Sequence, residues 1–308
     1  MKSKLAVMPA RRLWENMNST GNAAVEQLIA LLDLEPIEVN IFRGVSPKDR
    51  SQRIFGGQVL GQALVAATRT VEGRVCHSLH AYFLVPGDPK VPILYEVDRS
   101  RDGSSFSSRR VVAIQHGRQI FHMSVSFQVE ESGFEHQIDA PPAPPPESLP
   151  GEEEMRQRVA QHVPEAHREQ FLRQSPIELR SVEQTDIINR GRLPPHQSLW
   201  VRATGALPDD LALHQCVLAY ASDLTLLDTC ILPHGAVWFD DTVQLASVDH
   251  AMWFHRPFRA DDWLLYVQDS PAAYGARGFS RGLIYSKNGR LVASVAQEGL
   301  VRPVRPKQ

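Results

Sequence analysis

The residue most suggestive of chemistry is Asp223, a carboxylate inside the otherwise apolar run Leu218-Ala219-Tyr220-Ala221-Ser222-Asp223-Leu224-Thr225. The pattern predicts a helix over residues 209–227 that is apolar on nearly every side and therefore buried on most faces. Burial without a partner drives a carboxylate to its neutral form, so a charged Asp223 needs hydrogen bonds from neighbours or water. A carboxylate held in this way can act as a general base. The alternative is an ordinary aspartate that faces solvent or ends the helix.

Two further polar groups interrupt strand-like segments in the same half of the chain. The run QLASVDHAMWFHR, residues 244–256, predicts a strand whose alternation puts Ser247 on one face and His250 on the other. Gln297 interrupts a second predicted strand, residues 291–301. A hydroxyl and a carboxamide can both donate and accept hydrogen bonds. The alternatives are that these groups satisfy one another, face water or bond the backbone.

Familiar catalytic and metal-binding motifs are absent. There is no G-x-S-x-G elbow, H-E-x-x-H zinc motif, Walker loop or G-x-G-x-x-G fingerprint, which disfavours a serine hydrolase. His77 and His80 lie three residues apart on a predicted strand, so they point to opposite faces and cannot easily share one ion. We therefore expect neither a metal nor a cofactor.

Composition excludes some classes of protein. Thirty-three basic and thirty-five acidic residues leave a net charge of −2, which gives no field for gripping a nucleic acid. No uninterrupted apolar run approaches the roughly 18 residues of a membrane-spanning helix, so membrane insertion is not expected. Three widely spaced cysteines without a Cys-x-x-Cys pair fit a reducing cytoplasm.

A proline-rich stretch, residues 139–151, divides the chain into two halves with the same order of signals. Each half begins with a buried helix, over residues 55–70 and 209–227, followed by strands rich in aromatic and β-branched residues. Glycine-containing turn signals separate these strands. The predicted organisation is a disordered extension (1–22), an N-terminal domain (23–138), a Pro-rich and partly helical linker (139–208), a C-terminal domain (209–302) and a tail (303–308).

The halves also match at a nearly constant offset of 170 to 172 residues, which predicts a duplicated domain. A buried helix followed by a meander of antiparallel strands suggests a sheet wrapped around the helix, an α+β arrangement. Two such units would join edge to edge and so cover strands that otherwise invite aggregation. The matching dipeptides are His80-Ala81 with His250-Ala251, Leu94-Tyr95 with Leu265-Tyr266, Gly117-Arg118 with Gly289-Arg290, and Ser124-Val125 with Ser294-Val295.

Several long segments resemble the acyl-CoA thioesterase II family, over about residues 24–302. In the second half these are HQCVLAYASD (214–223), ASVDHAMWFHRPF (246–258) and VAQEG (295–299). In the first half they are FGGQVLGQAL (55–64), HSLHAYFLVPGD (77–88) and RDGSSFSSRRV (101–111).

The resemblance implies a double hotdog fold and hydrolysis of fatty acyl-CoA to a free acid and CoA. It also implies a catalytic Asp, a Ser or Thr, and a Gln, which here are Asp223, Ser247 and Gln297. Asp223 would act as general base on a water held also by the other two, or attack the substrate directly. Aligning the halves places Val65 near Asp223, His77 opposite Ser247, and Val125 or Phe127 opposite Gln297. The first half therefore lacks the set, and one site per chain is expected.

Two other functions are open. The same fold could host an acyl-CoA hydratase or dehydratase that uses Asp249 with His250 or His255, or it could only bind acyl-CoA. Backbone donors for an oxyanion could come from residues 209–213 or from Gly56 and Gly57. We expect a homo-oligomer, a dimer or a tetramer. The candidate ligands for the CoA phosphates are Arg53, Arg109, Arg110, Arg277, Arg281 and Arg302.

Overall fold

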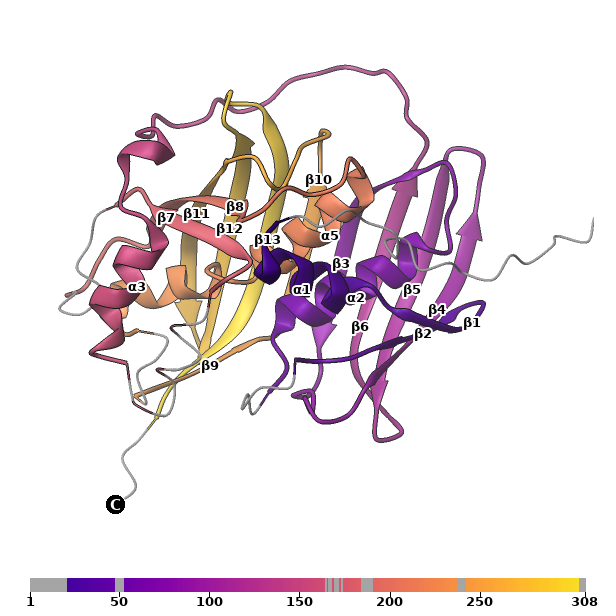
Figure 1. The fold of residues 1–308 in the computed structure, drawn as a ribbon, viewed down its shortest axis with the longest axis horizontal. Helices are drawn as coiled ribbons and strands as arrows, with labels where there is room; N and C mark the ends of the chain where they lie inside the picture. The colour runs from indigo at the N-terminus through magenta and orange to yellow at the C-terminus, as the bar shows by residue number, and fades with distance from the viewer. Residues whose placement is uncertain are drawn as a thin grey trace, which may run out of the picture.

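A computed structural model describes residues 21–47, 53–163, 174–183, 191–237 and 242–304, together with Glu165, Arg168 and Leu172 (Figure 1). The predicted disordered extension lies outside these residues except for Gly21 and Asn22. Asn22 caps the first helix, because its side chain accepts the amides of Ala24 and Val25.

The helices and strands alternate along the chain in two similar series. The first series is α1 (Ala23–Leu32), β1 (Glu35–Glu38), β2 (Ile41–Gly44), α2 (Gly56–Thr68), β3 (Val75–Phe83), β4 (Ile93–Asp102), β5 (Phe106–Gln115) and β6 (Arg118–Gln128). The connection holds the short helix η1 (Pro146–Ser148) and α3 (Glu152–Ala160). The second series is β7 (Ile177–Ser181), β8 (His196–Ala203), α5 (Leu211–Ser222), η2 (Leu227–His234), β9 (Val243–Ser247), β10 (Asp249–Phe254), β11 (Leu264–Tyr274), β12 (Arg277–Ser286) and β13 (Leu291–Pro303).

All of these strands belong to one antiparallel sheet of 13 strands. Its order is β1-β2-β4-β5-β6-β3-β10-β13-β12-β11-β8-β7, with β9 also paired to β13. The two halves join where β3 pairs with β10, with Ala81 opposite His250 and His80 opposite Ala251. The predicted α+β fold, in which two helix-wrapped sheets join edge to edge, is confirmed.

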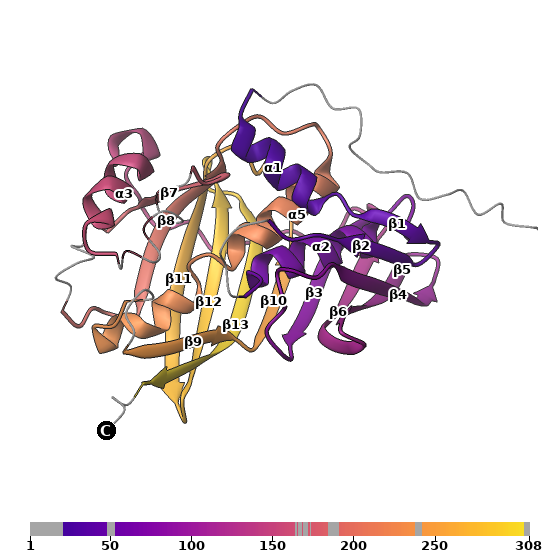
Figure 2. The same cartoon turned by 60° about the horizontal axis from the view of Figure 1, so that its bottom comes forward.

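Helices α2 and α5 lie side by side on the concave face of the sheet, at the joint between the halves (Figure 2). They run antiparallel, because Gly57 at the start of α2 approaches the Tyr220 carbonyl near the end of α5, and Gly61 approaches that of Cys216. A side chain at Gly57 would collide with the Tyr220 carbonyl. The glycines therefore let the two helices pack closely, and one hydrophobic core spans both halves.

The segment predicted to be a linker contributes to the second half's sheet. It holds α3, as its partly helical character suggested, but also β7 and β8. Strand β8 pairs with β11 and β7 pairs with β8. These strands stand before α5 as β1 and β2 stand before α2, so a boundary at residue 209 separates strands that pair within one sheet.

Two predicted elements are shorter than expected. The helix predicted to run to residue 227 ends at Ser222, where the chain turns before η2. The strand predicted over residues 244–256 is broken at Val248 into β9 and β10, both of which pair with β13. Both breaks adjoin residues predicted to do chemistry, Asp223 and Ser247.

One stretch, Leu211–His234, is long and apolar enough by composition to cross a membrane. In this structure 72% of its most apolar window is buried. It comprises α5 and η2, and α5 contributes to the common core. A core segment of a globular fold has the same composition.

Candidate active site

Asp223 lies at the C-terminal end of α5, not inside it. It is the first residue beyond the helix, and the chain turns there because the amide of Leu224 bonds the Ala221 carbonyl. The side chain of Asp223 is nevertheless only 3% exposed. Of the two alternatives for this residue, the helix-end position is therefore correct and solvent exposure is wrong.

The structure brings Asp223, Ser247 and Gln297 into direct contact. The Ser247 hydroxyl donates to Asp223 Oδ1 over 3.1 Å, and Gln297 Nε2 donates to the same oxygen over 3.0 Å. Gln297 Nε2 also donates to Ser247 Oγ over 2.7 Å. Gln297 is buried in β13, whereas Ser247, the last residue of β9, is only half-buried. Each of the three side chains is hydrogen-bonded to the other two, and Ser247 is the member most accessible to solvent.

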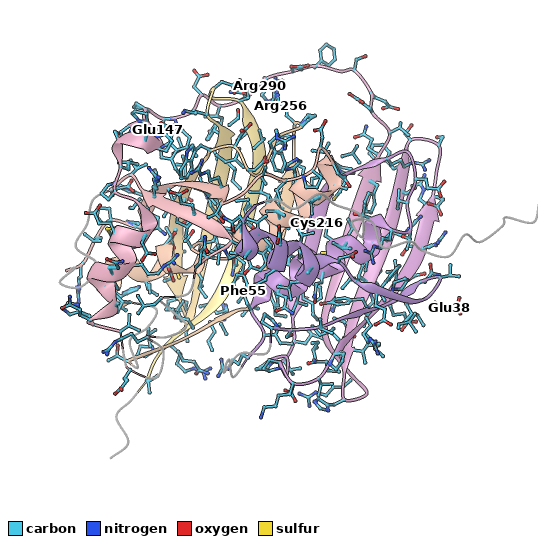
Figure 3. All side chains as sticks on the ribbon, viewed as in Figure 1. Glu38, Phe55, Glu147, Cys216, Arg256 and Arg290 are labelled. Atoms are coloured by element: carbon cyan, nitrogen blue, oxygen red, sulfur yellow. The ribbon has the colours of Figure 1, made fainter. Side chains whose placement is uncertain are left out.

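The first half completes this cluster with the start of α2. The backbone N–H of Gly57 donates to the Asp223 carboxylate. A Cβ placed at Gly56 would stand 2.6 Å from Asp223 Oδ2, so only glycine leaves room for the carboxylate. Figure 3 shows Phe55, the residue before α2, near the middle of the molecule below Cys216 of α5. The site is thus built from both halves at their joint.

Burial and hydrogen bonding act in opposite directions on the pKa of Asp223. Burial raises this pKa, and the bonds from Gln297, Ser247 and Gly57 lower it, which together leave it at about 6. The carboxylate is therefore ionised at neutral pH and remains basic enough to accept a proton.

His250 adds a side chain that the predicted set did not include. Its Nδ1 lies 3.0 Å from Gln297 Oε1, and its Nε2 lies 2.9 Å from Ser222 Oγ. The alternation of a continuous strand put Ser247 and His250 on opposite faces. The break at Val248 resets that alternation, so both side chains reach the same network.

The other residues considered for hydratase chemistry lie apart from this network. Asp249 accepts the amide of Glu298, and His255 is exposed and bonds Ser294. The two histidines weighed as a metal pair are also engaged elsewhere: His77 bonds Ser126, and His80 meets the Trp253 ring edge to face. Within the described part of the chain, no group of three or more His, Cys, Asp or Glu side chains could hold a metal ion.

The arginines proposed for CoA phosphates differ in their availability. Arg109 is buried and bonds Thr70 and Asp102, so its guanidinium serves the fold and the prediction for this residue is wrong. Arg277 pairs with Glu298 and Arg281 with Asp269. Arg110, Arg302 and Arg53 are exposed. Arg53 stands two residues before Phe55, next to the start of α2.

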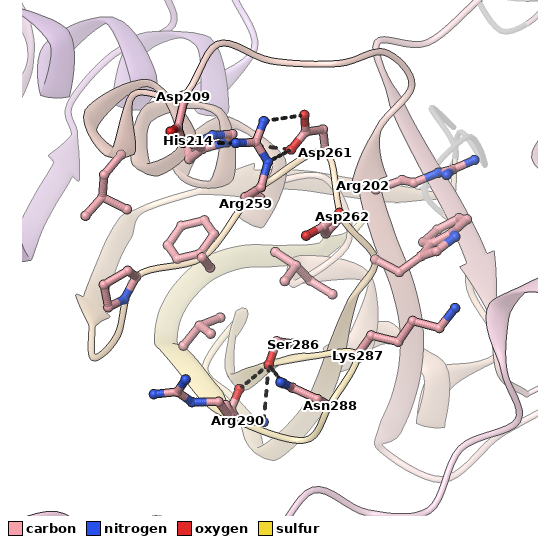
Figure 4. A pocket seen from close by; sticks show the side chains of 16 residues that line it. Arg202, Asp209, His214, Arg259, Asp261, Asp262, Ser286, Lys287, Asn288 and Arg290 are labelled. Atoms are coloured by element: carbon pink, nitrogen blue, oxygen red, sulfur yellow. Dashed lines mark hydrogen bonds and ion pairs between the residues drawn. The ribbon is translucent and has the colours of Figure 1, made fainter.

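A cavity of about 710 Å³ lies at the opposite end of α5 (Figure 4). Leu211 and His214, from the start of that helix, line it, and Arg259 there pairs with Asp261 and Asp209. A helix of 12 residues is about 18 Å long, so this cavity is remote from Asp223. For the same reason the amides of residues 209–213 lie too far away to serve a reaction at Asp223, whereas those of Gly56 and Gly57 are adjacent.

Family models match both halves of the chain. Residues 46–128 match the model of an acyl-CoA thioesterase N-terminal domain, and residues 166–300 match the acyl-CoA thioesterase model. The second match begins within the predicted linker and includes β7 and β8.

The curated relatives cover nearly the whole chain. Acyl-CoA thioesterase 2 of Haemophilus influenzae is 43% identical over 279 residues, which cover 90% of this chain and 98% of the relative. Acyl-coenzyme A thioesterase 8 of Homo sapiens is 43% identical over 285 residues, which cover 90% and 88%. The crystal structure of the acyl-CoA thioesterase II TesB2 from Mycobacterium marinum has a TM-score of 0.74 at 44% identity, covering 92% of this chain and 100% of that one. The chain belongs to the acyl-CoA thioesterase II family and is a thioester hydrolase with the hotdog fold.

Proposed function

We propose that the chain hydrolyses fatty acyl-CoA to a free fatty acid and CoA, with Asp223 as general base on a water oriented by Ser247 and Gln297. The observation that carries this proposal is the convergence of three donors on one buried carboxylate. Ser247 and Gln297 reach it from the second half and the Gly57 amide from the first.

The proposed reaction has two steps. Asp223 takes a proton from the water while the water oxygen bonds the thioester carbon, and the carbonyl oxygen becomes an oxyanion. The Gly57 amide already bonds Asp223, so our candidate donor to that negative charge is the neighbouring amide of Gly56, in the first turn of α2, where the helix dipole also favours an anion. The intermediate then expels the CoA thiolate, and Asp223 returns the proton to the departing sulfur. A thiol pKa of about 8.5 makes this departure easy without a separate acid.

The remaining features of the proposal concern location and contacts. Arg53 is our candidate for a CoA phosphate, because it is exposed beside the start of α2. The predicted homo-oligomer and the cytoplasmic location both remain predictions. The latter is supported by three free, buried cysteines.

Thiol release from saturated acyl-CoAs of two to eighteen carbons, with wild type beside Asp223→Asn, tests the proposal. We expect turnover to fall by about 10²-fold or more, the cost of losing a general base. Asp249→Asn is the matched control, since its side chain can still accept the Glu298 amide. Near-normal hydrolysis by Asp223→Asn would contradict the assignment of the base.

A single turnover in water labelled with heavy oxygen separates the base from a nucleophile. If Asp223 is the base, the first fatty acid released carries the label. If Asp223 attacks the thioester and water then opens the resulting anhydride at the Asp223 carbonyl, the label enters Asp223 first and reaches the product only in later cycles.

A further inference from the structure

We propose that His250 is a positioning residue that fixes which end of the Gln297 carboxamide faces Asp223, and that Ser222 selects the tautomer of His250. This inference rests on the proposed catalytic set, to which it adds a row of hydrogen-bonded side chains: Ser222, His250 and Gln297. These residues lie at the end of α5, in β10 and in β13, respectively.

The orientation of Gln297 follows from its neighbours. An ionised Asp223 only accepts hydrogen bonds, so the group of Gln297 that lies 3.0 Å from Asp223 Oδ1 must be the NH2 end. The same NH2 group donates to Ser247 Oγ, which in turn donates to Asp223. The carbonyl end, Oε1, then faces His250 Nδ1 at 3.0 Å.

This orientation determines the proton on His250. Oε1 is an acceptor, so Nδ1 must carry hydrogen and donate. In the neutral ring Nε2 is then an acceptor, and the hydroxyl of Ser222, 2.9 Å away, must donate to it. Ser222 can otherwise donate to the Ala219 carbonyl at 2.9 Å, so its hydrogen has two possible acceptors.

His250 is placed to orient and not to transfer protons. The side chain is 0% exposed, and its Nδ1 lies 4.0 Å from Asp223 Oδ1, beyond hydrogen-bond reach. Burial lowers its pKa to about 4, so it is neutral wherever Asp223 is ionised. Without the Nδ1 donor, Gln297 could turn end for end and present its carbonyl to the carboxylate, which would remove two donors from the site.

Two substitutions of His250 separate orientation from packing. His250→Asn keeps a donor near the position of Nδ1, and Ser222 falls back on Ala219. His250→Gln keeps a polar group near Nε2 but loses the donor to Gln297. We expect His250→Asn to retain kcat within about fivefold of wild type. We expect His250→Gln to lose about 10- to 100-fold in kcat at unchanged KM, the range known for partners that orient metal ligands. Equal kcat in the two variants at comparable thermal stability would overturn the inference.

A double-mutant cycle shows whether His250 acts through Gln297. In a Gln297→Leu background, His250→Gln should lower kcat no further, because there is no carboxamide left to orient. If the kcat losses of the two single variants multiply in the double variant, His250 acts independently of Gln297. That result would overturn this inference but not the proposed catalytic set. Near-normal activity of Gln297→Leu by itself would overturn the proposed catalytic set as well, so the two failures are distinguishable.

Ser222→Ala provides a test that keeps the histidine. Without the hydroxyl, His250 can adopt the other tautomer, so kcat should fall by about threefold to tenfold, intermediate between His250→Asn and His250→Gln. Ser270→Ala is the matched control, because Ser270 of β11 is also buried but donates to the backbone carbonyl of Phe279 in β12, outside the chain of bonds to Gln297. An unchanged kcat in Ser222→Ala, or an equal loss in Ser270→Ala, would contradict the role of Ser222.

Discussion

The two halves share one fold but differ at the end of their central helices. The residue that follows α2 is Arg69, which pairs with Asp33 and bonds the Leu34 carbonyl. The residue that follows α5 is Asp223, which receives donors from both halves. The position is used for structural pairing in one half and is available for chemistry in the other.

The strands beside these helices differ in the same way. The buried row of β6 is apolar throughout and consists of Phe121, Met123, Val125 and Phe127. The corresponding row of β13 includes the buried Gln297. The first half nevertheless does more than pack, since α2 supplies the Gly57 amide to Asp223. The duplicated fold therefore forms one composite candidate site, and the described residues of the first half show no second set at the corresponding positions.

The largest expected effect comes from comparing the loss of one buried glutamine in each half, Gln297 in β13 and Gln62 in α2. Gln297→Leu removes both of its donors, and we expect kcat to fall by about 10²-fold or more. Gln62→Leu in α2 removes bonds to the Leu31 carbonyl and Tyr95, so it should lower the melting temperature but leave kcat within about threefold. Comparable kcat losses in both variants would mean that the halves do not differ as described.

Substituting the two glycines at the start of α2 should have different effects, on catalysis at Gly56 and on stability at Gly57. Gly56→Ala would push its Cβ against Asp223 Oδ2, so kcat should fall by about tenfold or more at nearly wild-type stability. Gly57→Ala would push against the Tyr220 backbone and lower the free energy of unfolding by about 1–3 kcal/mol. Gly133→Ala, where nothing lies within 4 Å, is the control. Denaturant unfolding and kcat are measured for each variant. If both variants lost stability and neither lost kcat, the separate roles of Gly56 and Gly57 would be contradicted.

The pH dependence of kcat/KM should follow the ionisation of Asp223, the carboxylate of the second half. Because only ionised Asp223 can act as base, log kcat/KM should rise with pH and level off above about 6. The raised pKa also means that protonated Asp223 favours the folded state, so this contribution to stability is lost as pH rises through about 6. His250, with its pKa near 4, should add no inflection above that value. A profile that is flat between pH 5 and 8 would contradict the role of Asp223.

The smallest expected effect concerns Arg53 at the start of α2. Arg53→Ala should raise KM for acyl-CoA by about twofold to fivefold at unchanged kcat, the effect of one exposed charge contact. Arg281→Ala, which breaks an exposed pair with Asp269, should leave KM unchanged. Equal KM values for both variants and wild type would remove Arg53 from the proposed substrate contacts.

Sequence periodicity predicted the duplication and the two buried helices. It did not predict on which face of the sheet the matching residues of the two halves lie. The His-Ala dipeptides at 80–81 and 250–251 match in sequence. In the sheet, however, the exposed His80 pairs with Ala251, and the buried His250 pairs with Ala81. An even offset of 170 residues thus aligns residues from opposite faces. In the helices, the prediction set Val65 near Asp223. The structure instead makes Arg69 the equivalent residue, because Arg69 directly follows α2 as Asp223 directly follows α5.

The site was predictable as a set of residue types but not as a geometry. Nothing in the run around Val248 signals the break that turns His250 towards Gln297, because strand alternation assumes regular pairing. The polar and proline-broken character of residues 175–208 concealed β7 and β8. These strands depend on tertiary pairing, of β8 with β11 and of β7 with β8. The partnership of Gly57 with Asp223 spans both halves, so no local pattern could show it, although the paired glycines at 56 and 57 marked a close approach.

The most direct test of one composite site per chain is the binding stoichiometry of a non-hydrolysable acyl-CoA thioether, measured by titration calorimetry on the intact wild-type chain. We predict one molecule bound per chain, with binding lost or weakened in Gly56→Ala because the start of α2 forms part of that site. Two equivalent molecules per chain would show that the first half carries a working site of its own and would contradict the account.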